Sequence, residues 1–89
     1  MAWRVEFDDG AKRDLEKLDK PIALRITMFL RERVGQLDDP RSIGEALKGS
    51  RLGDFWRYRV GDYRIICDLE NQRLLVLVLR VGHRREIYR

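Results

Sequence analysis

Residues 55–69, FWRYRVGDYRIICDL, give the strongest indication of the fold. Two runs in which apolar and polar side chains largely alternate flank the dipeptide Gly61-Asp62. A two-residue turn between such runs is a strong signal for a β-hairpin. We therefore expect one strand over 55–60 and a second over 63–69.

The rest of the chain adds a third meander strand, a helical hairpin and an N-terminal strand. After a turn over 70–73, the apolar run 74–81 is expected to be a central strand because it lacks polar alternation. Residues 3–7 alternate like a half-buried strand, and two amphipathic helices follow, separated at Asp19-Lys-Pro21. Asp38-Asp-Pro40 ends the helical region, and residues 41–54 form a loop with one helical turn near 43–47.

These elements predict an α+β fold in a single domain, residues 1–89. The expected order is an N-terminal strand, the helical hairpin, and an antiparallel three-stranded meander. The helices pack on one face of one small sheet.

Composition limits the possible functions. The single cysteine, Cys67, excludes an internal disulfide and a cysteine–histidine zinc site. We expect no metal and no cofactor. The start of the chain is unlike a signal peptide, and no apolar run could span a membrane, so the cytoplasm is the expected location. Residues 1–47 carry nine basic and ten acidic side chains, whereas residues 48–89 carry ten and five. The excess of basic side chains in residues 48–89 suggests an anionic partner, or a solvated basic surface.

The strand period of two sorts the hairpin side chains onto opposite faces. Arg57, Arg59 and Arg64 share one face, which we call the arginine face. The opposite face, expected in the core, carries Trp56, Tyr58, Val60, Tyr63, Ile65, Cys67 and Leu69. Crowded guanidinium groups repel one another and are tolerated where they meet phosphates or carboxylates. The pattern alone fits such a site and fits three solvated arginines equally well.

The C-terminal segment RVGHRREIYR, residues 80–89, directly follows the third strand. It can fold back and bring His83, Arg84 and Tyr88 beside the arginine face. Metal-free RNA cleavage needs a proton acceptor for a 2′-hydroxyl, positive charge around the phosphate and a proton donor for the leaving oxygen. Histidine can exchange a proton near neutral pH, whereas arginine keeps its proton. A lone histidine and a terminal tyrosine are, however, more often structural.

Three motifs make the chain resemble the RelE/ParE toxin superfamily, on the RelE side, over essentially its whole length. They are Leu47-Lys-Gly49, WRYRVGDYRII at 56–66 and VLRVGHRREIY at 78–88. The resemblance implies a toxin of a type II toxin–antitoxin module that cuts mRNA in the ribosomal A site, without metal, by 2′-hydroxyl attack. It also implies a RelB-like antitoxin, the 70S ribosome and mRNA as partners, and operator DNA only through the antitoxin.

Carried over by position, the resemblance assigns the family's basic strand pair to Arg57 and Arg59, and its arginine after the turn to Arg64. Its C-terminal arginine and tyrosine fall on Arg84 and Tyr88, where the tyrosine stacks on a codon base. The best-known pattern has lysines at the first two positions, and an arginine does not replace lysine as a base. We therefore expect His83 to take a larger catalytic share.

A second function fits the same superfamily. ParE-like relatives inhibit DNA gyrase without cutting nucleic acid, and they usually lack the basic and tyrosine set found here. Cleavage of ribosome-bound mRNA, compared with inhibition of gyrase supercoiling, distinguishes the two.

Overall fold

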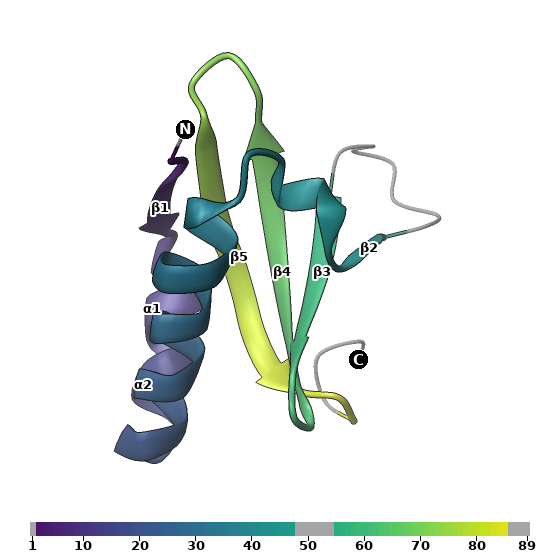
Figure 1. The fold of residues 1–89 in the computed structure, drawn as a ribbon. Coiled ribbons are helices and arrows are strands. Elements are labelled where there is room, and N and C mark those ends of the chain that lie inside the picture. Colours follow the sequence, from purple (N-terminus) through teal and green to yellow (C-terminus); the bar gives the residue numbers. More distant parts are fainter. Residues whose placement is uncertain (1, 48–54, 86–89) are drawn as a thin grey trace.

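The fold is α+β, as predicted from the sequence, in a computed structural model that describes residues 2–47 and 55–85. Its elements are β1 (Arg4–Phe7), α1 (Asp9–Glu16), α2 (Lys20–Met28), β2 (Glu45–Ala46), β3 (Phe55–Val60), β4 (Tyr63–Glu70) and β5 (Leu75–His83). The five strands form one sheet in the order β1-β5-β4-β3-β2 (Figure 1). The N-terminal strand, the helical hairpin and the meander are all confirmed.

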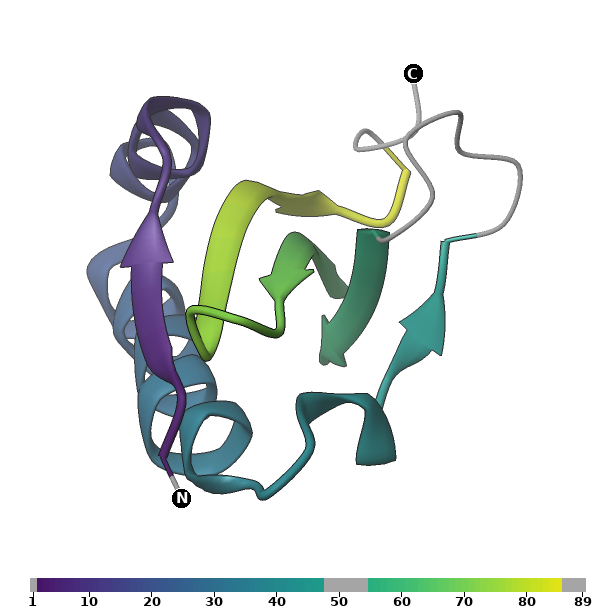
Figure 2. The same ribbon diagram turned by 90° about the horizontal axis from the view of Figure 1, so that it is seen from above.

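The pairing makes the sheet mixed and puts β5 inside it. β1 runs parallel to β5, whereas β3, β4 and β5 form an antiparallel meander. This confirms that the apolar third meander strand lies inside the sheet. Figures 1 and 2 place the two helices beside β1 and β5, far from β2.

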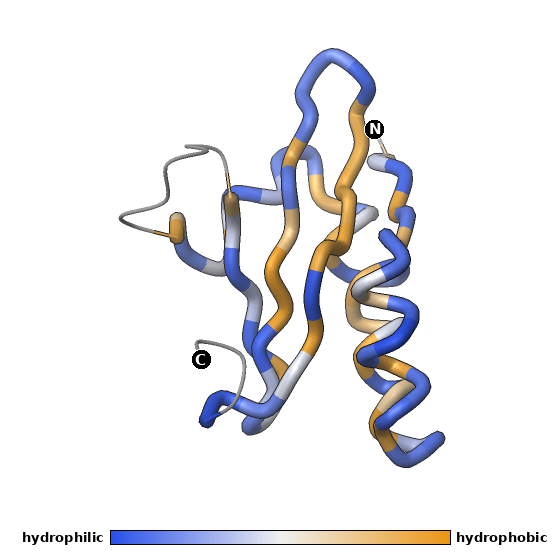
Figure 3. Tube along the Cα trace, turned by 180° about the vertical axis from the view of Figure 1, so that it is seen from behind, coloured by the Kyte–Doolittle hydropathy of each residue, from blue (hydrophilic) through white to orange (hydrophobic). Residues whose placement is uncertain are grey.

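The core lies between the helices and one face of the sheet. Ala11, Ile26 and Leu30 come from the helical region, and the meander contributes Tyr58, Val60, Ile65, Cys67, Leu69, Val76, Val78 and Val81. Figure 3 shows the hydrophobic residues concentrated along β4 and β5. Every meander residue that the period of two assigned to the core face is at least partly buried.

The helical region ends less regularly than the sequence predicts. After Met28 the chain continues through a π turn, Phe29–Arg33, and a 3₁₀ turn, Val34–Gln36. The helical turn expected near 43–47 is wrong. A 3₁₀ turn lies earlier, at Pro40–Ser42, and β2 follows as a short edge strand. Residues 45–46 form a strand and not a helical turn because Glu45 and Ala46 pair with Arg57 and Trp56 of β3.

The meander contains a β-bulge that the sequence pattern does not reveal. Cys67 pairs with Val78, but the preceding residue, Ile66, pairs with Arg80, so Leu79 is an extra residue in β5. An extra residue reverses which face the following side chains occupy. β5 also extends to His83, two residues beyond the predicted end.

Within the described residues, no helix is both long and apolar enough to cross a membrane.

Candidate functional site

The three strand arginines lie on neighbouring positions of one sheet face, as their spacing predicts. Arg59 of β3 pairs directly with Arg64 of β4, and Arg57 pairs with Ile66. Their neighbours Tyr58 and Ile65 are buried on the opposite face. Arg59 is exposed, and Arg57 and Arg64 are half-buried. The hairpin therefore presents a cluster of positive charge on the side of the sheet away from the core.

The arginine face also carries a carboxylate that sequence reasoning missed. Glu45 of β2 pairs with Arg57 in the ladder, and its Oε2 forms an ion pair with the Arg57 guanidinium. Only the pairing of a two-residue strand brings these groups together, and no periodicity in residues 41–47 signals it. Glu45 is exposed and is able to accept a proton, which Arg57 is not.

Arg59 and Arg64 have different surroundings from Arg57. Arg64 Nη1 donates to the carbonyl oxygens of Gly61, at 3.3 Å, and Tyr63, at 3.2 Å. In residues 2–47 and 55–85 neither Arg59 nor Arg64 forms an ion pair with a carboxylate. Two like charges directly opposite each other destabilise a strand pair. Among the described residues, no carboxylate neutralises these two guanidinium groups, which makes them candidates for binding an anionic ligand.

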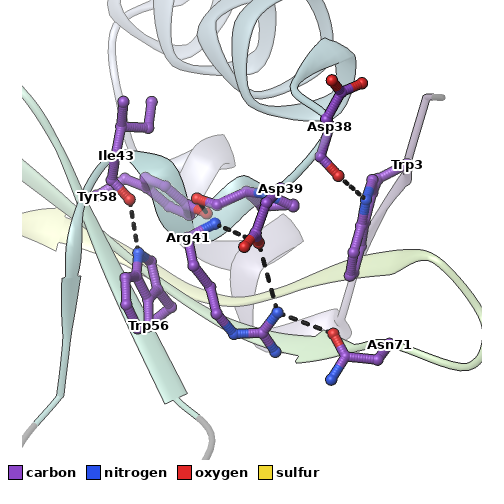
Figure 4. Close-up of polar contacts among 9 residues, drawn as sticks. Trp3, Asp38, Asp39, Arg41, Ile43, Trp56, Tyr58 and Asn71 are labelled. Carbon is purple, nitrogen blue, oxygen red and sulfur yellow. Dashed lines mark hydrogen bonds and ion pairs between the residues drawn. The ribbon is translucent and has the colours of Figure 1, made fainter.

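Residues 38–46 lead from the helical region to β3 and carry Glu45, and we call them the connector. Side-chain hydrogen bonds fix the connector in place (Figure 4). Trp56 Nε1 donates to the carbonyl of Ile43 at 2.7 Å, and the Tyr58 hydroxyl donates to that of Pro40 at 2.7 Å. At the start of the connector, Trp3 Nε1 donates to the carbonyl of Asp38 at 3.2 Å. These bonds hold β2 in register with β3 and so position Glu45 beside Arg57.

Gly44 allows the connector to approach β3 closely. Its φ is +80°, and a Cβ there would lie 2.6 Å from the carbonyl oxygen of Arg57. A larger residue at this position would therefore both strain the backbone and push β2 away from β3.

The C-terminal segment begins beside the hairpin turn. Arg84 N donates to the carbonyl of Asp62 at 2.8 Å, which places Arg84 next to the turn that Arg64 also contacts. The Arg84 side chain is exposed. Tyr88, the remaining predicted site residue, lies outside the described residues.

His83 lies on the other face of the sheet, which corrects the expectation that it sits beside the arginines. Because of the bulge, it pairs with Tyr63 and shares the face of the buried Val81. Its ring makes an edge contact with Tyr63, with ring centroids 5.7 Å apart. His83 Nδ1 accepts a hydrogen bond from Arg85 N at 3.2 Å. In the neutral ring, the proton therefore resides on Nε2.

His83 lines a hollow of about 360 Å³ between α1 and the end of the meander, together with Asp14, Lys17, Leu18 and Tyr63. At this hollow, Asp14 of α1 accepts hydrogen bonds from β5. Beyond Phe7, β1 no longer pairs with β5, and the Asp14 carboxylate takes its place as an acceptor. Asp14 Oδ2 accepts from Arg80 Nε at 2.8 Å and from Val81 N at 2.8 Å.

These contacts shift the pKa values of both Asp14 and Arg80. Partial burial raises the pKa of Asp14, but the Arg80 and Val81 hydrogen bonds and the charges of Arg80 and Lys17 together lower it below the ordinary 3.8. The same hydrogen bond raises the pKa of the Arg80 guanidinium. Both groups are therefore charged near neutral pH, and their ion pair joins α1 to β5.

Two other ionisable groups are held neutral in the core. Burial raises the pKa of the Cys67 thiol and of the Tyr58 hydroxyl. Cys67 is fully buried, which confirms its predicted place in the core. In the part of the chain that the structure describes, no group of three or more histidine, cysteine, aspartate and glutamate side chains could hold a metal ion.

The family model that matches the chain is described as the ParE toxin of the type II toxin–antitoxin system parDE, and the match spans residues 5–88. Toxin RelG of Mycobacterium tuberculosis is 34% identical, and the alignment covers 100% of this chain and 99% of that protein.

Solved structures agree with this match. A chain of the toxin–antitoxin complex RelBE2 from Mycobacterium tuberculosis superposes with a TM-score of 0.84 at 28% identity, covering 97% of this chain and 95% of that chain. A chain of the RelB–RelE complex from Methanococcus jannaschii gives a TM-score of 0.67 at 26% identity, covering 93% of this chain and 94% of that chain. The arginine face, with Glu45 beside it, is therefore a candidate anion-binding site on this fold.

Proposed function

Because the chain belongs to the RelE/ParE superfamily and is a RelE-type toxin of a type II toxin–antitoxin system, we propose that it is a ribosome-dependent endoribonuclease. In this proposal it cuts the mRNA codon in the A site, without a metal ion or cofactor. The observation that carries the proposal is the direct pairing of Arg59 with Arg64 beside the Arg57–Glu45 ion pair.

The arginines supply the positive charge that the reaction needs. A guanidinium group binds phosphate oxygens with two parallel hydrogen bonds and remains charged throughout. Arg59, Arg64 and Arg84 bind the scissile phosphate and stabilise the charge that develops on it. Arg57 contributes when the phosphate binds its guanidinium group together with Glu45 or displaces the Glu45 carboxylate from it. Tyr88 stacks on a base of the codon.

The bond changes are those of an internal transesterification. The 2′-oxygen forms a bond to phosphorus while the bond from phosphorus to the 5′-oxygen breaks. The 2′-hydroxyl proton passes to a base on the protein, and a proton is delivered to the leaving 5′-oxygen. The products are a 2′,3′-cyclic phosphate and a 5′-hydroxyl.

We assign the role of proton acceptor to Glu45. It is a carboxylate on the same face as the arginines and in contact with one of them. His83 is the alternative proton acceptor. It lies on the opposite face of the sheet from the arginines, which argues against His83 as the main base. Substituting Glu45 and His83 separately distinguishes the two.

The partners follow from the same reasoning. Solved relatives include toxin–antitoxin complexes with RelB-type proteins. We propose that a RelB-like antitoxin neutralises this chain, that the 70S ribosome and mRNA are its targets, and that it reaches operator DNA only through the antitoxin.

The second candidate function is inhibition of DNA gyrase, which the ParE description of the matching family favours. The direct test incubates the purified protein with mRNA-programmed ribosomes and, separately, with gyrase and plasmid DNA. We expect cut mRNA and unchanged supercoiling. Inhibited supercoiling with intact mRNA would support the gyrase function instead.

A further inference from the structure

The chain beyond β5 begins with two successive backbone N–H groups that each have a fixed acceptor. Arg84 N donates to the carbonyl of Asp62 in the β3–β4 turn at 2.8 Å, and Figure 1 shows this end of β5 beside that turn. Arg85 N donates to His83 Nδ1 at 3.2 Å. Because peptide groups are planar, the first bond orients the peptide group before the Cα of Arg84 and the second orients the one after it. Together they fix the direction in which the Arg84 side chain leaves the backbone.

The His83 ring that accepts the second bond is itself held by the sheet. His83 is the last residue of β5 and pairs with Tyr63 of β4. Its side chain is half-buried, and its ring packs edge-on against the Tyr63 ring. A ring held in this way offers its Nδ1 as an acceptor at a fixed position.

The bond from Arg85 N exists only while the His83 ring is neutral. A neutral imidazole has one nitrogen that accepts and one that donates, whereas a protonated imidazole donates from both. A protonated Nδ1 would face a second donor, Arg85 N, and the hydrogen bond would be lost. Histidine side chains change charge between about pH 5 and 8. The turn over residues 83–85 should therefore be closed while the ring is neutral and open when the ring takes up a proton.

The other ionisable groups near the ring offer no substitute for the lost bond. Those that share the hollow with it come from α1, β4 and β5 and are Asp14, Lys17, Tyr63 and Arg80. Among the described residues that line this hollow, Asp14 is the only carboxylate, and it already accepts hydrogen bonds from Arg80 and from Val81 N. A protonated ring therefore finds no unbonded carboxylate in the hollow.

We propose that His83 is a positioning residue whose neutral ring holds the turn that orients Arg84. The inference rests on the proposed function, in which Arg84 binds the scissile phosphate. A guanidinium group whose backbone is already fixed loses less conformational freedom when it binds. Neutral His83 thus promotes cleavage without exchanging a proton with the RNA, and protonation of the ring weakens cleavage by releasing the turn.

Nuclear magnetic resonance on the full wild-type chain, without a histidine tag, tests the turn itself. His83 is the only histidine of the chain, so the ring signals belong to it without further assignment. At about pH 8 we expect the ring proton on Nε2, and at lower pH we expect the Arg85 amide signal to shift together with the ring signals. A ring proton on Nδ1 at that pH, or an Arg85 amide that does not follow the titration of the ring, overturns the proposal.

Two variants test the effect on cleavage of ribosome-bound mRNA. In His83→Asn the side-chain oxygen occupies the place of Nδ1 on the same carbon, accepts readily from the backbone N–H two residues on, and does not titrate. In His83→Leu no acceptor remains. At about pH 8 we expect the asparagine variant to cut about twofold to tenfold faster than the leucine variant, the range for loss of one hydrogen bond. At a pH below the ring titration, the wild type should fall to the rate of the leucine variant while the asparagine variant stays ahead of both.

Comparison of the three proteins at the same pH cancels the pH dependence of the ribosomes. Equal rates for the two variants at about pH 8 overturn the proposal, because asparagine would not replace histidine as a general base. A ratio of wild-type to asparagine-variant rate that stays constant through the ring titration also overturns it. If the wild type cuts no mRNA, the proposed nuclease fails, while the resonance experiment still decides whether His83 holds the turn.

Discussion

The Glu45 carboxylate of β2 forms an ion pair with the Arg57 guanidinium of β3, across the antiparallel pair that joins these two residues. The contact places a group that can accept a proton beside groups that can bind phosphate. It also gives a role to β2, which is only two residues long. The proposed chemistry therefore depends on how the connector before β3 is held.

Replacing Glu45 with glutamine tests the proton acceptor. An exposed ion pair contributes little to stability, about 0–1 kcal/mol, so the fold should be retained. Loss of a general base should lower the single-turnover rate of mRNA cleavage about 10²–10⁴-fold. Glu70→Gln is the matched control, since Glu70 pairs with Arg73 at the far end of the meander. A Glu45→Gln protein that cuts like this control excludes Glu45 as the base.

Replacing His83 with glutamine tests the alternative acceptor. Because His83 lies on the opposite face from the arginines, we expect the cleavage rate to fall by about tenfold at most, below the range for loss of a general base. The expected loss comes from the contact with Tyr63 and the hydrogen bond from Arg85 N. A loss as large as that expected for Glu45→Gln, with an altered pH profile, would return the role of base to His83.

Replacing Arg59 with alanine should separate stability from activity. Removing one of two like charges that face each other across a strand pair stabilises the pair by about 0.2–1 kcal/mol. The melting temperature should therefore rise by about 1–8 °C. Losing a hydrogen bond to a charged phosphate should slow cleavage about tenfold to hundredfold. A variant that is less stable than the wild type and equally active would contradict both parts of this argument.

Replacing Asp14 with asparagine tests the attachment of α1 to β5. The hydrogen bonds from Arg80 and Val81 to an ionised acceptor predict a loss of about 1.5–3 kcal/mol in the free energy of unfolding near neutral pH. Urea unfolding measures this loss, and Glu16→Gln, an exposed carboxylate on the same helix, is the control.

The pH dependence of that loss has a definite sign. The pKa of Asp14 is lowered in the folded state, so its contribution is fully present above the ordinary value of 3.8. The contribution disappears as the pH falls through the lowered folded-state pKa. The difference between the wild type and Asp14→Asn should therefore shrink below pH 3.8. A difference that grows in acid would show that Asp14 does not stabilise the fold as an anion.

Salt provides an independent test of the partner. If the arginine face contacts RNA phosphates, each contact releases bound counterions, and binding to ribosomes should weaken steeply as salt rises. The slope of log Kd against log salt should decrease in magnitude by about one for each contacting arginine that is replaced by alanine. Ribosome binding that is insensitive to salt would argue against phosphate recognition.

The strand pattern predicted the arginine face correctly because β3 and β4 pair without interruption around a two-residue turn. In such a hairpin the period of two alone fixes which side chains share a face. His83 was expected to reach the arginine face by a fold-back after residue 81, but β5 continues to His83, and the extra residue Leu79 places its side chain on the opposite face. The residues of the bulge carry no distinctive sequence pattern.

Glu45 was missed for a different physical reason. A two-residue strand has no periodicity, and it exists only because Glu45 and Ala46 find partners in β3. Its position depends on long-range hydrogen bonds from Trp56 and Tyr58 to the connector, as Figure 4 shows. Those aromatic residues were correctly expected in the core, but the carbonyls that they bind could not be read from spacing.

We propose that the arginine face cuts mRNA in the ribosomal A site. The most direct measurement maps the 5′ ends of mRNA on purified ribosomes stalled with a defined A-site codon, for the wild type and for Arg64→Ala. We expect new ends within that codon carrying a 5′-hydroxyl, and at least about tenfold fewer of them with Arg64→Ala. Intact A-site codons with the wild-type protein, or equal cutting by the variant, would contradict it.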